Sequence, residues 1–161
     1  MTTAAYDGES LAVSVSLSNG NVHNWYQALF SGGKGKTAWH AALCGEPVDN
    51  LCVRDWLDDM LTPKPIKRVE EGEDPELLEQ PAVAEDFYGL VLTSEGHYEL
   101  TSDLVLIPLS GKAAVGTGWQ FAASAMDHGK NATEALQYAS TRDPLTTGDV
   151  SSVQQLRIVK E

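Results

Sequence analysis

Two cysteines and four histidines are the side chains of this chain that most often carry metal, redox or nucleophilic chemistry. Cys44 and Cys52 have seven residues between them, a spacing that fits neither the C-x-x-C redox signature nor a structural zinc site. The histidines stand in different segments and form no H-E-x-x-H array: His23, His40, His97 and His128. We therefore expect no metal site, no cofactor and two buried thiols, as in a reducing compartment.

A glycine-rich run, Gly32-Gly33-Lys34-Gly35-Lys36, is the segment that most resembles a phosphate-binding loop. It lacks the G-x-x-x-x-G-K-[ST] spacing that lets backbone N–H groups cradle phosphates. The run is therefore predicted to be a mobile turn between two strands.

The charge balance limits the partners of the chain. There are 11 Lys and Arg against 23 Asp and Glu, a formal charge of -12, which repels phosphate backbones and excludes nucleic acid as a partner. Residues 69–86 hold eight of the acids, no Lys or Arg, and the helix breakers Gly72, Pro75 and Pro81. This composition predicts a solvated insertion at about 62–86, with one helical turn at 75–79 capped by Asp74. The alternative is an acidic docking site for a basic partner.

Length and hydropathy indicate one globular domain over residues 1–161, of which 42% are apolar. No apolar run approaches 18 residues, and the first eight residues lack both parts of a signal peptide. We expect no membrane association and a cytoplasmic location.

The elements that must position any site follow from hydrophobic periodicity and turn residues. Strands are expected at 10–17 and 37–43, followed by a helix at 48–61. After the acidic insertion we expect a hairpin of 87–92 with 97–101, a short strand pair of 105–108 with 113–115, helices at 119–128 and 132–141, and a last strand at 150–159. This order favours an α+β protein in which mostly antiparallel sheets are covered by helices.

Three segments carry a resemblance to a known family. Met1-Thr2-Thr3 with Tyr6-Asp7-Gly8 resembles the opening of proteasome-type N-terminal nucleophile (Ntn) hydrolases, in particular HslV-like peptidases and their short phage-encoded relatives. Gly116-Thr117-Gly118 resembles the family's Gly-Ser-Gly, and residues 131–148 resemble its last helix and following loop. The resemblance implies an αββα sandwich, two mostly antiparallel sheets between helical layers.

The family's chemistry supplies expected roles for individual residues. Once Met1 is removed, the Thr2 hydroxyl would be the nucleophile, and its own α-amine, with a pKa near 8, would be the base. A Lys stabilises the alkoxide, an Asp orients that Lys, and backbone N–H groups of a Gly-rich turn hold the oxyanion. By the same resemblance, Thr117, Asp143 and Thr146 are expected to support the site.

Two family residues are replaced in this chain. The Asp that follows the first strand's Leu-Ala falls at Ser14, and the Lys that follows a Gly-Asn-Val stretch falls at Asn24. Neither residue supplies a positive charge, and no Lys or Arg occurs between Met1 and Gly33. Losing one such group costs about 100- to 10,000-fold in rate.

We therefore expect a proteasome-like pseudo-peptidase, phage-encoded and located in the host cytoplasm, that acts as a self-assembling scaffold or binding protein. Homo-oligomers, ring-type assembly included, are the expected partners, with exposed apolar residues on the helices at 48–61 or 132–141 as their contacts. The alternative is that these apolar residues belong to the core of the domain. The alternative function is an active N-terminal threonine peptidase after removal of Met1.

Overall fold

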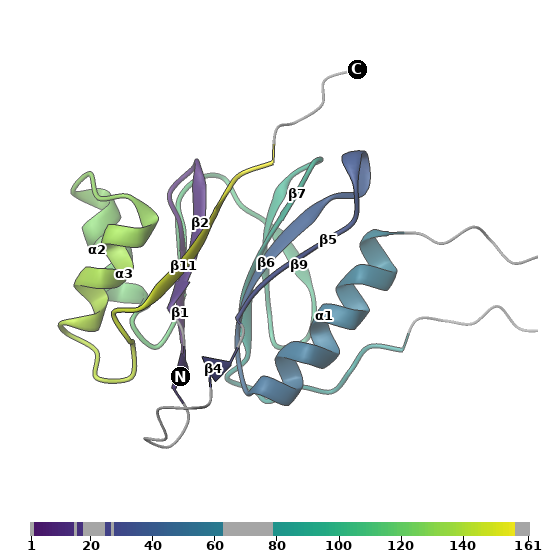
Figure 1. Cartoon of the computed structure of the whole chain (residues 1–161), viewed down its shortest axis with the longest axis horizontal. Coiled ribbons are helices and arrows are strands. Elements are labelled where there is room, and N and C mark those ends of the chain that lie inside the picture. The colour runs from purple at the N-terminus through teal and green to yellow at the C-terminus, as the bar shows by residue number, and fades with distance from the viewer. Residues whose placement is uncertain (1, 15, 18–24, 27, 63–78, 157–161) are drawn as a thin grey trace, which may run out of the picture.

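Two β-sheets lie face to face between two layers of helices (Figure 1). The computed structural model describes residues 2–14, 16–17, 25–26, 28–62 and 79–156. Asn24, residues 63–78 of the acidic insertion, which include all but the last residue of the expected turn at 75–79, and the end of the last expected strand lie outside the described residues.

The first sheet contains four strands in the order β10-β1-β2-β11, and every pairing in it is antiparallel. Its strands are β1 (Thr3–Tyr6), β2 (Ser10–Ser14), β10 (Ala113–Gly116) and β11 (Val150–Gln154). The β1–β2 hairpin turns at Gly8, whose φ of +100° is a conformation that glycine adopts without strain. Asp7 accepts the N–H groups of Glu9 and Ser10 and so fixes the turn.

The second sheet contains five antiparallel strands in the order β5-β6-β7-β8-β9. These are β5 (Leu29–Gly32), β6 (Trp39–Cys44), β7 (Tyr88–Thr93), β8 (His97–Leu100) and β9 (Leu106–Pro108). The glycine-rich run joins β5 to β6 through a short 3-10 turn, η1 (Gly35–Thr37), as the turn prediction requires. A separate pair, β3 (Ser16–Leu17) with β4 (Trp25–Tyr26), lies outside both sheets.

Helix α1 (Pro47–Leu61) covers the outer face of the second sheet, and α2 (Trp119–Asp127) and α3 (Ala132–Ser140) cover the first (Figure 1). Pro47 occupies the first position of α1, where its missing N–H costs nothing. The capping box of α3 joins Asn131 and Glu134, each side chain accepting the other's backbone N–H. No helix in the described part of the chain is long and apolar enough to cross a bilayer.

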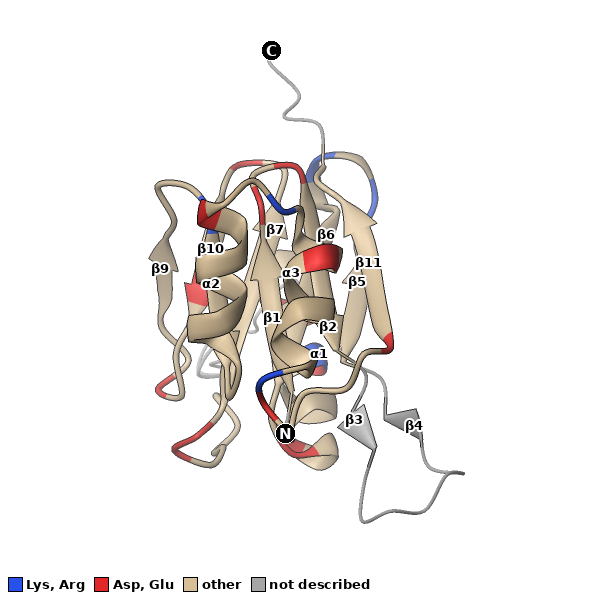
Figure 2. Ribbon diagram, turned by 90° about the vertical axis from the view of Figure 1, so that its left-hand side faces the viewer, with Lys and Arg blue, Asp and Glu red and all other residues tan. Residues whose placement is uncertain are grey.

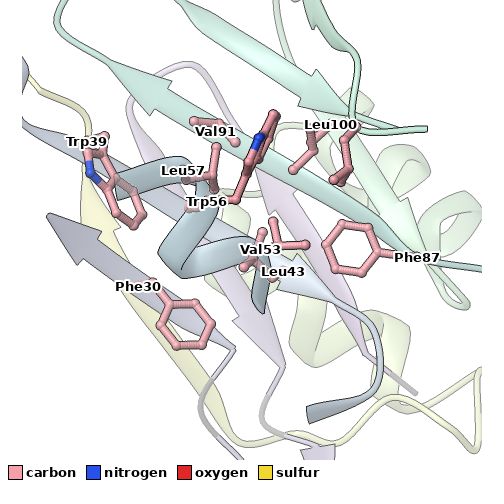
Figure 3. Packing of buried hydrophobic residues seen from close by; sticks show 11 residues of the cluster. Phe30, Trp39, Leu43, Val53, Trp56, Leu57, Phe87, Val91 and Leu100 are labelled. Carbon is pink, nitrogen blue, oxygen red and sulfur yellow. The ribbon is translucent and has the colours of Figure 1, made fainter. Parts of the chain in front are cut away.

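Three apolar layers hold these elements together. Between α1 and the second sheet pack large side chains, among them Trp39, Val53, Trp56 and Phe87 (Figure 3). The layer between the sheets is built from aliphatic residues such as Leu11 and Leu90. Under α2 and α3 the layer consists mostly of alanines, which bring both helices close to β1 and β2.

The α+β class and the antiparallel sheets between helices are confirmed, and the three helices agree with their predictions to within one residue at each end. The expected pairing of 105–108 with 113–115 is wrong, since β9 pairs with β8 and β10 pairs with β1. The run predicted as one strand over 10–17 divides into β2 and β3, which have different partners.

The expectation of two buried thiols is also wrong. Cys44 is buried between the sheets, but Cys52 is exposed on α1. The reason is helical phase: Val53, Trp56 and Leu57 form the buried face of α1, and Cys52 lies outside it.

Candidate functional site

Thr2 lies buried immediately before β1, next to the end of the edge strand β10. Gly116, which stands opposite Thr3 in the β1–β10 register, has a φ of +99°. A Cβ at this position would overlap the carbonyl oxygen of Thr2. Residue 116 must therefore be glycine for the N-terminal threonines to lie where they do.

The hydroxyl of Thr3 joins three segments that are far apart in the sequence. Its Oγ1 lies 2.8 Å from Thr146 Oγ1, and the N–H of Gly118, at the start of α2, donates to it at 2.8 Å. Thr146 Oγ1 donates its single proton to Asp143 Oδ2 at 2.6 Å. The Thr3 hydroxyl must therefore donate to Thr146, which gives the chain of bonds one direction, from Gly118 toward Asp143.

Asp143 is the charged end of this chain and is only 8% exposed. Its Oδ2 also accepts the Thr117 hydroxyl at 2.6 Å, and its Oδ1 accepts the N–H of Leu145 at 3.1 Å. Burial alone would raise the pKa of Asp143, but the Thr117 and Thr146 hydroxyls and the Leu145 N–H stabilise the anion more, so the pKa falls below its ordinary value. At neutral pH this carboxylate is therefore ionised, and both of its oxygens accept hydrogen bonds.

Ser14, at the end of β2, is completely buried beside Thr3 on the neighbouring strand. Its Oγ accepts the backbone N–H of Thr3 at 2.9 Å. This is the position at which the resemblance calls for an aspartate, and here it holds a neutral hydroxyl. Asn24, the other replaced position, lies outside the described residues.

The structure thus brings Thr117, Asp143 and Thr146 together by hydrogen bonds and links Ser14 to them through Thr3. Thr2 precedes Thr3 in the chain, but within the described residues its side chain makes no hydrogen bond to this cluster. The polar groups that contact this cluster within the described residues are hydroxyls, backbone amides and one carboxylate; no Lys, Arg or His side chain hydrogen-bonds to it there. Such a site can orient a hydroxyl, and in the part of the chain that the structure describes no cationic side chain hydrogen-bonds to it. No group of His, Cys, Asp and Glu suited to a metal ion occurs in the same part of the chain.

Sequence reasoning missed Thr3, the residue through which the network runs. The adjacent pair Thr2-Thr3 was the available signal, because successive residues of a strand face opposite sides of a sheet. Ala5, two residues after Thr3, packs under α2 and α3, whereas Ala4, two residues after Thr2, packs between the sheets. Strand alternation therefore directs the Thr3 side chain toward Asp143 and the helices.

Searches with the sequence against family models and curated proteins return no match. The structure, in contrast, is similar to several solved structures. It matches BPH of Thiobacillus denitrificans with a TM-score of 0.65 at 15% identity, over 100% of both chains. It matches HslV of Trypanosoma brucei with a TM-score of 0.57 at 13% identity, over 96% of this chain and 98% of that one.

A third structural neighbour is Anbu, whose chain extends beyond the matched region. The helical assembly of the Anbu complex from Pseudomonas aeruginosa gives a TM-score of 0.64 at 11% identity, over 96% of this chain and 80% of that one. Identities this low establish the fold and nothing finer. The chain has the proteasome- and HslV-like fold of N-terminal nucleophile hydrolases.

Proposed function

We propose that this protein is a catalytically degenerate member of the proteasome-like fold that serves as a self-associating scaffold or binding protein. The observation that carries the proposal is Ser14, whose buried hydroxyl takes the place of a carboxylate and is already occupied by the Thr3 N–H. A hydroxyl there cannot hold a lysine beside the Thr2 oxygen.

Formation of an alkoxide on Thr2 would lack electrostatic support. An alkoxide forming in a buried site needs a nearby positive charge, because unpaired charge is costly to bury. The polar partners within the described residues supply none, and the sequence before residue 33 contains no Lys or Arg. With Met1 attached, the Thr2 nitrogen is also an amide and cannot act as a base.

Exposed apolar side chains on both helical layers support self-association. Val48 is 70% exposed and Leu51 45% exposed, three residues apart on α1. On the opposite layer, Phe121 of α2 and Tyr138 of α3 are partly exposed as well. Apolar residues on outer faces favour contact between copies of the chain, and one structural neighbour is a helical assembly. The proposal includes the phage origin and the host cytoplasm as location.

Analytical ultracentrifugation at micromolar concentration tests the scaffold role. We expect a species of several protomers that dissociates when Val48 and Leu51 are both changed to Glu. Val105→Glu, at an equally apolar and exposed position near β9, is the matched control and should leave the assembly intact. A wild-type chain that stays strictly monomeric would contradict the scaffold role.

The second candidate is a working threonine peptidase, which the Thr3–Thr146–Asp143 network, one residue after Thr2 in the chain, favours. A BPH structure in complex with epoxomicin is among the similar folds. Intact-mass spectrometry after incubation with a peptide epoxyketone separates the two candidates. If the protein is catalytically degenerate, neither the wild type nor Thr2→Ala should form an adduct. A wild-type chain that has lost Met1 and forms an adduct, together with a Thr2→Ala variant that forms none, would establish the peptidase.

A further inference from the structure

An open cavity of about 460 Å³ lies at the edge of the sandwich where β10 and the start of α2 face β7 and β8. Six residues line it: Tyr88, Glu99, Ala114, Val115, Gly116 and Trp119. In Figure 2, β9, β10 and α2 lie together on one side of the molecule, at this edge. None of the expected site residues lines the cavity, but Gly116 connects it to Thr2.

Two aromatic rings and one carboxylate determine the chemistry of this cavity. Tyr88 is 39% exposed and Trp119 is 49% exposed, unusually high values for side chains of this size next to a core. Glu99 is half-buried and pairs with Leu90 in the β7–β8 register. Because Leu90 packs between the sheets, the side chain of Glu99 also lies on the inner face of the second sheet. Within the described residues Glu99 has no ion pair.

We propose that this cavity binds the guanidinium group of an arginine in a basic segment of a partner protein. Aromatic faces attract cations, and a carboxylate adds charge and two hydrogen-bond acceptors. Arginine fits better than lysine because its planar group stacks on a ring and binds a carboxylate through two N–H groups. The net charge of -12 attracts a basic partner over a longer range.

The edge strand β10 gives the partner's backbone a place to bind. In the described part of the chain β10 pairs with β1 alone, so its outer edge carries backbone groups that an extended segment can use. Such a segment would lie along Ala114 and Val115, with its arginine between Tyr88 and Trp119. The inference goes beyond the proposed function, since it requires neither assembly nor cleavage.

Fluorescence anisotropy with two labelled pentapeptides tests the pocket on the full chain. One peptide has arginine at its centre, and the other has citrulline, which has the same shape without the charge. We expect the arginine peptide to bind about tenfold more tightly, the equivalent of about 1.4 kcal/mol. Equal affinities would overturn the proposal.

Variants then assign the binding to the cavity. Glu99→Gln and Trp119→Ala should each weaken the arginine peptide about tenfold. Trp119→Phe, which keeps an aromatic face, should bind nearly as well as the wild type. Glu95→Gln, an exposed acid at the tip of the same β7–β8 hairpin, is the matched control and should change nothing. Unchanged affinity in Glu99→Gln, a variant too conservative to unfold the chain, would refute the assignment.

Discussion

The two sides of the N-terminal threonines differ in what they retain. On the α2–α3 side, Asp143 accepts two hydroxyls and one backbone N–H, and the network reaches Thr3 through Thr146. On the β2 side, a single hydroxyl, that of Ser14, accepts one N–H. Among the described residues, one side therefore has a buried charge that accepts three hydrogen bonds, and the other has a neutral hydroxyl.

The difference shows which of the two sides holds the fold together and which side only a reaction would need. The Asp143 network ties the start of α2, the segment after α3 and strand β1 to each other, so the fold needs it whether or not the protein cleaves anything. Within the described residues, Ser14 on the β2 side connects only to the neighbouring strand β1. Under the proposed function, a carboxylate at this position would serve catalysis alone, so a serine can replace it without loss of structure.

The largest effect should come from Asp143→Ala. It removes three hydrogen bonds to a charged acceptor and leaves the Thr117 and Thr146 hydroxyls unpaired, at a cost of about 3 kcal/mol in the free energy of unfolding. The corresponding fall in Tm is about 6–12 °C, measurable by circular dichroism. Asp149→Ala, an exposed acid in the same loop, serves as control. Equal melting temperatures for both variants would show that the network does not hold the fold.

A paired test on the threonines should give a smaller effect. Thr3→Val removes the acceptor of the Gly118 N–H and should lower the free energy of unfolding by about 2 kcal/mol. Thr2→Val keeps the shape of the buried side chain and removes a hydroxyl that makes no hydrogen bond within the described residues, so it should lower the free energy of unfolding by less than about 0.5 kcal/mol. Urea denaturation of both variants measures the difference. The reverse order would place the structural role on Thr2.

Ser14→Ala should lower the free energy of unfolding by about 1 kcal/mol, because the buried N–H of Thr3 loses its acceptor. Ser152→Ala, at an exposed position of the neighbouring strand β11, is the control and should leave urea denaturation unchanged. If Ser14→Ala lowered the free energy of unfolding as much as Asp143→Ala does, the β2 side would be as important for the fold as the α2–α3 side.

Lowering the pH should change the stability difference between wild type and variant on one side of the threonines and not on the other, and this effect should be smaller and gradual. The folded-state pKa of Asp143 lies below its ordinary 3.8, because hydrogen bonds outweigh burial, so its stabilising contribution is present above 3.8 and is lost as pH falls through the folded pKa. The stability gap between wild type and Asp143→Asn should therefore be constant from pH 7 to 5 and narrow below pH 4. The gap for Ser14→Ala should not change over this range. A pH-independent gap for Asp143→Asn would contradict the lowered pKa.

The sequence predicted the local structure better than the long-range pairings. The ends of α2 and α3 were predictable because Gly129, Asn131 and Pro144 act within one turn of the helix they limit. Strand β1 was missed, since a run of four residues with two alanines shows no alternation. The pairing of β9 and β10 was mistaken because proximity in sequence favours a hairpin, whereas here the two strands belong to different sheets.

The candidate site shows the same limit. Thr117, Asp143 and Thr146 were expected from a resemblance, and the structure brings their side chains together, but their catalytic role remains a prediction. Thr3 could not be found by such means, since its partners are 115 and 143 positions away in the chain. Only the register of β1 between β2 and β10 determines which threonine faces Asp143.

The unequal environment of the two thiols makes the native chain suitable for site-specific labelling. Burial raises the pKa of Cys44 to about 12, so that thiol does not form the reactive thiolate near neutral pH, whereas Cys52 is open to solvent on α1. A maleimide dye would therefore attach at a single site without any engineered residue. Energy transfer between donor- and acceptor-labelled copies would then report how α1 surfaces approach one another as protomers associate.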